Sequence, residues 1–175
     1  NISGWYAAGG DWAITDSGYR ANNPAMRNTY AYSDEVIPTG KNFVLEGKLH
    51  IEVPEGGGGA GIAIVPNTAN PNETWYCANI DKMYGNTTRL FKNRYPGGDF
   101  WSVGRNLTAE ETAATDYTFR IEYTDGVFRY YLNDTLVDSY SKDTFTGGVV
   151  SLMTFNSDTT FQNVNITYGG PSVTG

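Results

Sequence analysis

The chain has 175 residues and a formal net charge of −7, with thirteen Tyr, eight Phe and four Trp. This length fits one domain with a sizeable core. The negative charge argues against nucleic acid and anionic membrane surfaces as partners, because both need a basic patch, and no apolar run approaches the roughly 20 residues that span a bilayer. Abundant aromatic and turn residues without a long helical pattern predict an all-β sandwich.

The first third of the chain predicts strands of uneven length. Residues 2–36 mix turn residues with aromatics, and we expect short strands or irregular edge structure in which Trp5 and Trp12 pack. Apolar and polar residues then alternate over 43–53, which predicts a half-buried strand. Residues 60–65 are apolar throughout, as is typical of a central strand.

The middle of the chain predicts a strand with two different faces at 75–81 and its hairpin partner at 87–92. Residues 93–105 predict a long loop that overhangs this strand. Long loops in compact domains are usually functional, and this one is rich in aromatics. One helical turn is expected at 108–112. Alternation turns Tyr76, Ala78 and Ile80 to the core, and Trp75, Cys77, Asn79 and Asp81 to a second face, with Cys77 as a buried structural thiol.

Two hairpins are predicted between residues 117 and 140. Asp125-Gly126 is a two-residue turn signal, and Asn133-Asp134 is a second turn. The first turn sets Thr124 opposite Val127, Tyr123 opposite Phe128, Ile121 opposite Tyr130 and Phe119 opposite Leu132 on the apolar face, and Glu122 opposite Arg129 on the charged one. The second turn sets Tyr130 opposite Val137 and Arg129 opposite Asp138.

The strand after Gly147-Gly148 also has two informative faces. Val150 and Leu152 continue the core, whereas Val149, Ser151, Met153 and Phe155 face the other way. That second face is too apolar for open water, so it is expected to be covered or to serve as a ligand platform. A loop at 156–158 and a last alternating strand at 161–166 complete the prediction.

Several motifs along nearly the whole chain point to one family. They are Gly4-Trp5, Gly9-Gly10-Asp11-Trp12, the segments 43–51 and 59–61, Tyr76 to Asp81, Phe128 to Asp134, residues 145–152, and Thr160 to Val164. In these motifs and their order, the chain resembles the levan-binding carbohydrate-binding modules of family 66, which are appended to exo-acting fructanases. The resemblance implies a jelly-roll-like, two-sheet antiparallel β-sandwich of the concanavalin A-like type over residues 1–170, with 171–175 as a linker or tail.

The resemblance also implies a function. It implies a non-catalytic module, secreted or at the cell surface and part of a larger multimodular protein, that binds the fructans levan or inulin. The strand positions of Glu46, Asn79 and Asp81 match the family pattern. Two positions depart from it: Pro66 stands where the family commonly has Arg, and Phe155 stands where it commonly has Trp. The first departure removes a strong hydrogen-bond donor.

The sequence carries no recognisable hydrolase motif. A glycosidase needs two carboxylates that face each other across a sugar, and the sandwich glucanases carry them as Glu-X-Asp-X-X-Glu, which does not occur here. The Asn-Asp-Pro and Arg-Asp-Pro motifs of fructanase catalytic domains are also missing. His50 is the only histidine, and no serine is placed beside it as a nucleophile. We therefore expect binding without catalysis.

Sugar recognition needs carboxylates, amides or guanidinium groups for hydroxyls and aromatic rings for C–H faces. We expect Asp81 to accept hydrogen bonds, Arg94 to donate them and Trp101 to be the platform. Asp81 and Glu46 could instead pair with Lys48 or Arg89, and Trp101 or Phe155 could simply close the core. The candidate carbohydrate-binding residues are Glu46, Trp75, Asn79, Asp81, Arg94, Trp101 and Phe155.

A structural calcium is a further candidate, although the metal site is unknown. Asp99, Asp116, Asp143 and Asp158 fall in predicted loops and carry hard oxygen ligands, but no fixed spacing singles out a site. Two rival functions stay open. One is an adhesion or protein-interaction domain of a bacterial surface protein, favoured if the second face is large, flat and without a pocket. The other is a structural sandwich that braces a fructanase.

Overall fold

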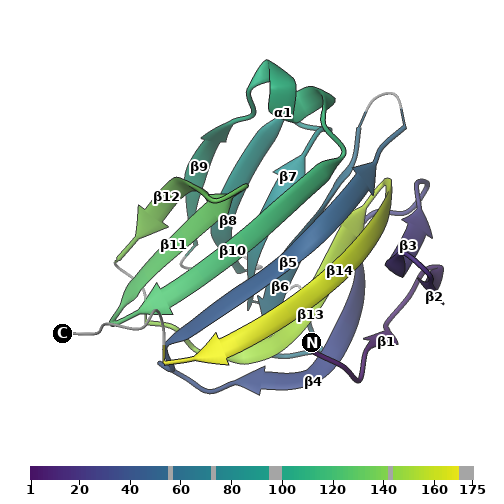
Figure 1. Ribbon diagram of the computed structural model, residues 1–175. Coiled ribbons are helices and arrows are strands. Elements are labelled where there is room, and N and C mark those ends of the chain that lie inside the picture. Colours follow the sequence, from purple (N-terminus) through teal and green to yellow (C-terminus); the bar gives the residue numbers. More distant parts are fainter. Residues whose placement is uncertain (55–56, 72–73, 95–99, 142–143, 170–175) are drawn as a thin grey trace.

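Two antiparallel sheets pack face to face in the computed structural model (Figure 1), which describes residues 1–175 except 55–56, 72–73, 95–99, 142–143 and 170–175. Within these described residues each sheet has seven strands. Sheet A contains, in spatial order, β1 (Tyr6–Ala7), β4 (Thr29–Ile37), β13 (Gly148–Phe155), β6 (Gly59–Val65), β7 (Thr74–Asp81), β8 (Thr87–Arg94) and β9 (Trp101–Asn106). Sheet B contains β12 (Thr135–Tyr140), β11 (Val127–Leu132), β10 (Asp116–Thr124), β5 (Phe43–Glu52), β14 (Ser157–Tyr168), β3 (Gly18–Asn23) and β2 (Trp12–Thr15).

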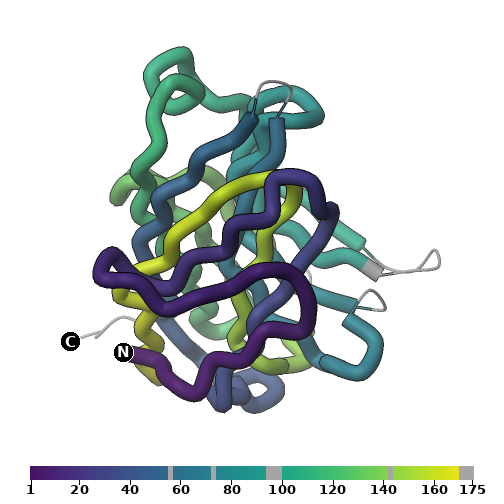
Figure 2. Tube along the Cα trace, turned by 90° about the vertical axis from the view of Figure 1, so that its right-hand side faces the viewer, coloured from purple at the N-terminus to yellow at the C-terminus, as the bar shows by residue number. Residues whose placement is uncertain are grey.

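The predicted two-sheet antiparallel sandwich is therefore confirmed. The last two strands are central: β13 lies between β4 and β6, and β14 lies between β5 and β3. The N-terminal segment runs across one edge, from β1 in sheet A to β2 in sheet B (Figure 2). The predicted domain boundary after residue 170 lies outside the described residues.

A core of side chains from both sheets fills the space between them. Phe43, Phe119, Phe128 and Tyr130 are fully buried there, because alternate residues of each strand point inward, and Phe145 is buried with them from the segment before β13. The rings contact one another edge-on or tilted, for example Phe128 and Phe145 with centroids 5.6 Å apart. The predicted inward faces of 43–53, 75–81 and the strand at 149–155 are confirmed.

The hairpin of β10 and β11 has the predicted register. Ile121 pairs with Tyr130, and Tyr123 pairs with Phe128. Asp125 and Gly126 have φ angles of 48° and 86°, the left-handed values that a two-residue turn of the primed type requires. The predicted charged face needs a correction, however. Glu122 pairs with Arg129 as expected, but it is only 7% exposed and its carboxylate accepts a hydrogen bond from Arg120.

The predicted register of the second hairpin is wrong by one residue. Leu132 pairs with Thr135, but a bulge between Tyr130 and Tyr131 shifts the ladder, so Tyr130 pairs with Asp138 and Arg129 with Ser139. The extra residue of a bulge changes the pairing partner of every residue beyond it. The bulge could not be predicted from the turn residues alone.

Two predicted loops are shorter than expected. Residues 93–105 do not form one long loop, because β8 extends to Arg94 and β9 begins at Trp101. The predicted loop at 156–158 reduces to Asn156, which has φ 47°, since β14 begins at Ser157. Conversely, the segment expected to be short or irregular includes most of the nine-residue strand β4 (Thr29–Ile37).

The helical turn is confirmed as α1 (Ala109–Ala113), at the top of Figure 1. Thr108 and Glu111 form a reciprocal capping box, which satisfies backbone donors at the start of the helix. Arg105 binds the Glu111 carboxylate at 2.7 Å and lowers the pKa of Glu111 to about 2. No helix in the described part of the chain is long and apolar enough to cross a membrane.

Candidate functional site

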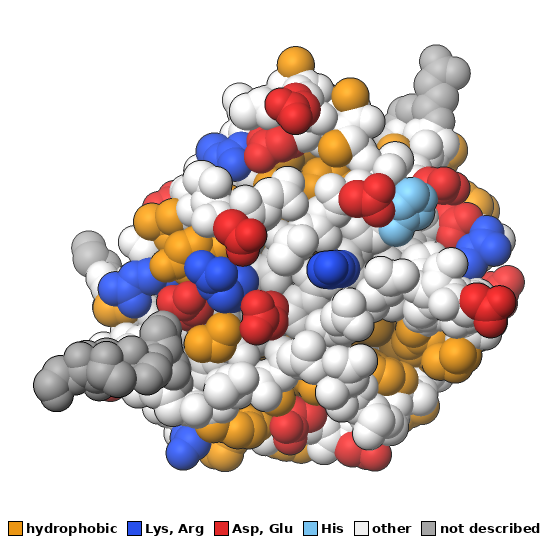
Figure 3. Space-filling view, in the orientation of Figure 1, with side chains coloured by type: hydrophobic (Ala, Val, Ile, Leu, Met, Phe, Trp, Pro, Cys, Tyr) orange, Lys and Arg blue, Asp and Glu red, His pale blue; other side chains and the backbone are white. Residues whose placement is uncertain are grey.

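The outer faces of the two sheets differ in chemistry. The outer face of sheet B is charged and polar, as the scattered acidic and basic side chains and the single histidine in Figure 3 show. The outer face of sheet A carries a second cluster of buried side chains, separate from the core between the sheets. Its members are Tyr30, Tyr32, Ala63, Val65, Trp75, Cys77, Met153 and Phe155, with Phe91 and Val149 packed against them.

Aromatic side chains from distant strands meet over the centre of this face. Tyr30 of β4 contacts Trp75 of β7 edge-on, with ring centroids 6.0 Å apart, although β13 and β6 lie between their strands. Trp75 also contacts Phe91 of β8 edge-on at 5.1 Å. On β6, Gly61 pairs with Met153 on one side and with Asn79 on the other, and a Cβ added there would lie 2.1 Å from the Ala78 carbonyl oxygen. The close approach of the neighbouring backbone therefore requires glycine at this position.

Three buried polar atoms on this face have no hydrogen-bond partner among the described residues. They are the hydroxyl of Tyr30 and the indole nitrogen Nε1 of Trp75, both in residues that are 6% exposed, and the amide oxygen Oδ1 of Asn79, which is 8% exposed. A buried donor or acceptor left unpaired destabilises the fold by roughly 1–3 kcal/mol. Most buried polar atoms in folded proteins are paired, so these atoms are groups that a water molecule or a ligand can pair.

The first hollow on this face has a volume of about 170 Å³. Trp75, Asn79, Asp81 and Phe155 line it, together with Met153. Three short connections form its two walls: on one side Arg27 and Asn28 between β3 and β4 with Asn156 between β13 and β14, and on the other side Met83 and Tyr84 between β7 and β8.

Both walls are fixed by backbone hydrogen bonds. The Asn156 amide donates to the Met26 carbonyl at 2.7 Å, which fastens the loop that carries Arg27. The Asp81 oxygen Oδ1 accepts from the amides of Met83 and Tyr84 at 2.8 and 3.0 Å. Such a preformed wall lowers the conformational entropy that a ligand must remove on binding.

A second hollow of about 260 Å³ lies on the other side of β7. It shares Asn79 and Asp81 with the first, because their side chains stand between the two. Its other lining residues come from β8, β9 and the residue before β9: Thr87, Arg89, Phe91, Lys92, Asn93, Phe100, Trp101 and Ser102. Asp81 is the only acidic side chain among the described residues that line either hollow.

This arrangement suits a neutral, hydroxyl-rich ligand. Asp81 uses Oδ1 for the loop, which leaves Oδ2 as an acceptor, and Asn79 Oδ1 and Trp75 Nε1 add an acceptor and a donor. Exposed rings stand at the rim, with Tyr84 69% exposed and Phe100 70% exposed. Aromatic surface beside a few fixed polar groups is the composition of a small-molecule site.

Four of the seven predicted site residues come together here: Trp75, Asn79, Asp81 and Phe155. Glu46 does not join them, because β5 belongs to sheet B and Glu46 points to that sheet's outer face. Trp101 is a strand residue that points inward, 7% exposed and stacked on Tyr140 at 4.2 Å, so it cannot be the predicted exposed platform. Arg94 ends β8, and its side chain lies outside the described residues.

The sequence prediction missed Arg27, Tyr84, Arg89 and Phe100. Arg89 could have been found, because it is paired with Asn79 across β7 and β8 and therefore shares its face. Arg27, Tyr84 and Phe100 lie outside regular strands. Their positions depend on loop conformations that no alternation pattern predicts.

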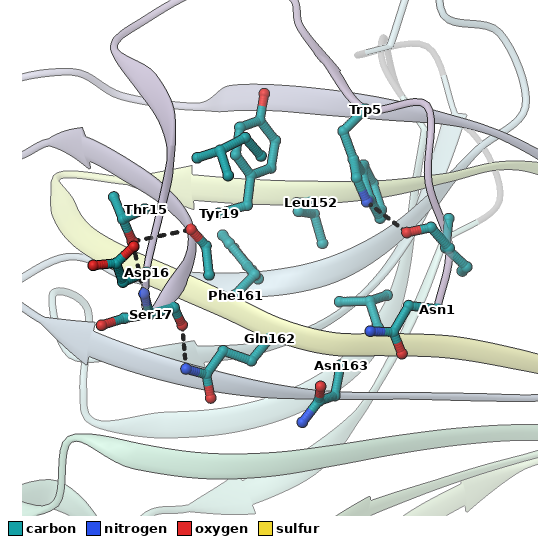
Figure 4. Close-up of a pocket in the computed structure, with 14 residues that line it drawn as sticks. Asn1, Trp5, Thr15, Asp16, Ser17, Tyr19, Leu152, Phe161, Gln162 and Asn163 are labelled. Carbon is teal, nitrogen blue, oxygen red and sulfur yellow. Dashed lines mark hydrogen bonds between the residues drawn. The ribbon is translucent and has the colours of Figure 1, made fainter.

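Three larger hollows lie elsewhere, and none of the described residues that line them has an unpaired buried polar atom; the smallest, of about 300 Å³, lies beside Asp34 and Glu35. One of about 480 Å³ lies between the N-terminal segment and the β2–β3 turn (Figure 4). There the Trp5 indole donates to the Ile2 carbonyl at 3.1 Å, and the Gln162 amide donates to the Ser17 carbonyl. Unlike the face of sheet A, this hollow has no buried polar atom without a partner among the described residues.

The third of these hollows, of about 500 Å³, lies on the outer face of sheet B beside His50. The His50 ring contacts Asp116 at 2.8 Å and Glu52 at 3.1 Å. These hydrogen bonds raise the pKa of His50. Both imidazole nitrogens thus contact carboxylates, and the side chain is 42% exposed. The three residues form a surface hydrogen-bond network and not a catalytic triad.

The calcium hypothesis gains no site in the described residues, where no group of three acidic, histidine or cysteine side chains could hold a metal. Asp116 and Asp158 are strand residues that bind His50 and Arg20, which corrects their predicted place in loops. Asp99 and Asp143 lie outside the described residues. Cys77 is a buried free thiol whose pKa burial raises, so it behaves as an apolar side chain.

Comparison with known proteins yields structural neighbours only. No protein-family model and no curated protein matches the chain. A carbohydrate-binding module of family 66 from Bacillus subtilis superposes with a TM-score of 0.74 at 22% identity, covering 95% of this chain and 96% of that one. A Bacillus licheniformis β-glucanase has a TM-score of 0.63 at 10% identity, with coverages of 94% and 91%.

A legume lectin-like domain from Entamoeba histolytica has a TM-score of 0.65 at 10% identity, with coverages of 94% and 89%. At these identities the likeness shows the fold, which is the concanavalin-like sandwich. The fold implied by the resemblance to the family 66 modules is therefore confirmed. Unrelated functions share such folds, so function depends on the site.

Proposed function

We propose that this chain is a non-catalytic carbohydrate-binding module whose site is the outer face of sheet A. The observation that carries the proposal is the unpaired donor and acceptor, Trp75 Nε1 and Asn79 Oδ1, buried beside Asp81 on an aromatic surface. Sugar hydroxyls both donate and accept, so one sugar can satisfy both atoms. The family 66 module and the lectin-like domain among the structural neighbours support the same function.

Fructan is the first ligand to test, because the sequence motifs resemble the levan-binding modules. A site that encloses one sugar unit is expected to be weak, with a Kd of about 1 mM, or about −4 kcal/mol. Such a module would act through avidity, by holding a larger extracellular or cell-surface protein on its polysaccharide.

A protein-interaction domain is the second candidate. It would need a large, flat apolar face without a pocket. The face of sheet A instead has two hollows of about 170 and 260 Å³ and, among the described residues, three buried polar atoms that a flat apolar partner would leave unpaired. A structural brace for a fructanase is the third candidate, and the neighbouring sequence in the intact gene would distinguish it.

Affinity electrophoresis in gels that contain levan, inulin or a β-glucan tests the proposal. The informative variant is Asp81→Asn, because its amide oxygen still accepts from the 83 and 84 amides while the second acceptor becomes a donor. We expect retardation of the parent by fructan, and a loss of about 1–3 kcal/mol in the variant with unchanged thermal melting.

Glu46→Gln is the matched control, a carboxylate-to-amide change on the opposite face. It is expected to bind like the parent. If Glu46→Gln loses binding and Asp81→Asn keeps it, the site lies on sheet B. If only β-glucan retards the protein, the fructan assignment fails and the carbohydrate-binding function stands. If no polysaccharide retards it, the proposed function fails.

A further inference from the structure

We infer that the face of sheet A binds at least two consecutive units of a neutral oligosaccharide, one on each side of the Asn79 and Asp81 side chains. This inference rests on the proposed function and extends it from one hollow to both. The second hollow would be a subsite that none of the sequence motifs assigns. The two hollows meet at the same two acceptors, so a ligand that fills both passes directly over them.

The two hollows are built from corresponding parts. Each has one arginine in its lining, Arg27 in the first and Arg89 in the second. Each also has one highly exposed ring, Tyr84 in the first and Phe100 in the second. A guanidinium donates to neighbouring hydroxyls and a ring carries a C–H face. Either hollow thus has what one sugar unit needs.

Arg89 is available for this role. It is exposed, and it makes no hydrogen bond or ion pair with the described residues. It pairs with Asn79 across β7 and β8, and Thr87 pairs with Asp81. Paired outward residues on neighbouring strands have Cβ atoms roughly 5 Å apart. The Arg89 head therefore reaches the hydroxyls of a unit that also contacts the central acceptors.

The direction of the chain follows from the strand order. The first hollow involves β13 and β7, and the second involves β7, β8 and β9. The two hollows are therefore displaced from each other across the strands, and neighbouring strands lie about 4.8 Å apart. A ligand that fills both hollows crosses the strands. The central position of Asp81 means that it contacts both units.

Calorimetric titration against saccharides of increasing length tests the inference. The probes are fructose with β-2,6- and β-2,1-linked dimers and trimers, and glucose with β-1,3- and β-1,4-linked dimers and trimers. We expect the best dimer to bind at least about fivefold more tightly than its monomer. Arg89→Ala and Phe100→Ser should lower the dimer affinity to about the monomer value, because only the first hollow then holds a sugar unit. Both residues are exposed, so the variants should fold.

Arg129→Ala, on the outer face of sheet B, is the matched control and should change neither affinity. Equal affinity of monomer and dimer for the parent would overturn the two-unit site while leaving the carbohydrate-binding function in place. Unchanged dimer binding by both Arg89→Ala and Phe100→Ser would also overturn it. If no saccharide of any length binds, the proposed function and this inference fail together.

Discussion

Burial and pairing separate residues that look alike in the sequence. Glu46 and Glu122 both alternate with core residues in sheet B and both point outward. Glu122 nevertheless is 7% exposed and accepts from Arg120 Nε at 3.0 Å, and the Arg120 guanidinium stacks 4.0 Å from the Tyr131 ring. Glu46 is exposed and has no such partner among the described residues. This difference in burial and pairing predicts that replacement by Ala lowers the stability of the protein more at Glu122 than at Glu46.

We predict that Glu122→Ala destabilises the protein by about 1–3 kcal/mol, because it removes a buried hydrogen bond to a charged group. Glu46→Ala should change stability by less than about 0.5 kcal/mol. Ile121→Ala, with 2% exposure and a position between Leu45 and Tyr130, should cost about 2–5 kcal/mol. Urea titrations measure all three. Equal losses for the two glutamates would contradict the burial assigned to Glu122.

His50 predicts a pH dependence of stability. Its bonds to Asp116 and then Glu52 raise its folded pKa above the unfolded value of about 6.5. The stabilisation is therefore complete below about pH 6.5 and disappears as the pH rises through the folded pKa. The stability difference between the parent and His50→Gln should be largest near pH 5.5 and should shrink by about pH 8.5. Urea midpoints at both pH values measure it, and a constant difference would refute the coupling.

At the scale of elements, the β10–β11 turn isolates a backbone effect. Gly126 has φ 86°, and a Cβ added there would meet nothing within 4 Å. Gly126→Ala is thus predicted to cost about 1–2 kcal/mol through the left-handed backbone alone. Asp125→Asn is the control. Asn tolerates the φ of 48° and keeps the side-chain oxygen that accepts from Asn42, so little change is expected. Chemical denaturation of both variants decides between strain and packing.

The same hairpin shows what the sequence could predict. Its turn residues and its alternation specify one register, and the structure has that register. The next hairpin contains a bulge, which adds one residue without a turn signal, so its pairing could not be deduced. The loop at 93–105 was overestimated because Pro96, Gly97 and Gly98 interrupt the pattern, although strand pairing resumes at Trp101.

The candidate site was predictable in part for a similar reason. Alternation along 75–81 correctly placed Trp75, Asn79 and Asp81 on one face. Alternation does not say to which sheet a strand belongs, however. The prediction therefore grouped Glu46 with residues of the other sheet, although the full thickness of the sandwich lies between them. It also placed Trp101 on the surface, whereas β9 directs this side chain into the core.

For the whole molecule, the charge distribution predicts how binding responds to salt. The chain has a net charge of −7, and the described residues that line the two hollows include one carboxylate beside arginines. A neutral sugar meets no long-range attraction, so its Kd should change less than about twofold between about 0.02 and 0.5 M NaCl. Calorimetry at both salt concentrations measures this. An affinity that falls steeply with salt would indicate an acidic polysaccharide held by Arg27 and Arg89.

The central positions of β13 and β14 have a consequence during synthesis. Each of these late strands separates two strands made much earlier, β4 from β6 in one sheet and β5 from β3 in the other. While a ribosome is still translating residues before 148, those earlier strands have unpaired edges, which are prone to aggregation. Sheet A cannot close until Phe155 has left the exit tunnel, and sheet B cannot close until Tyr168 has left it. Because such long-range pairing is intrinsically slow, this nascent chain should depend on chaperones until its last strand is released.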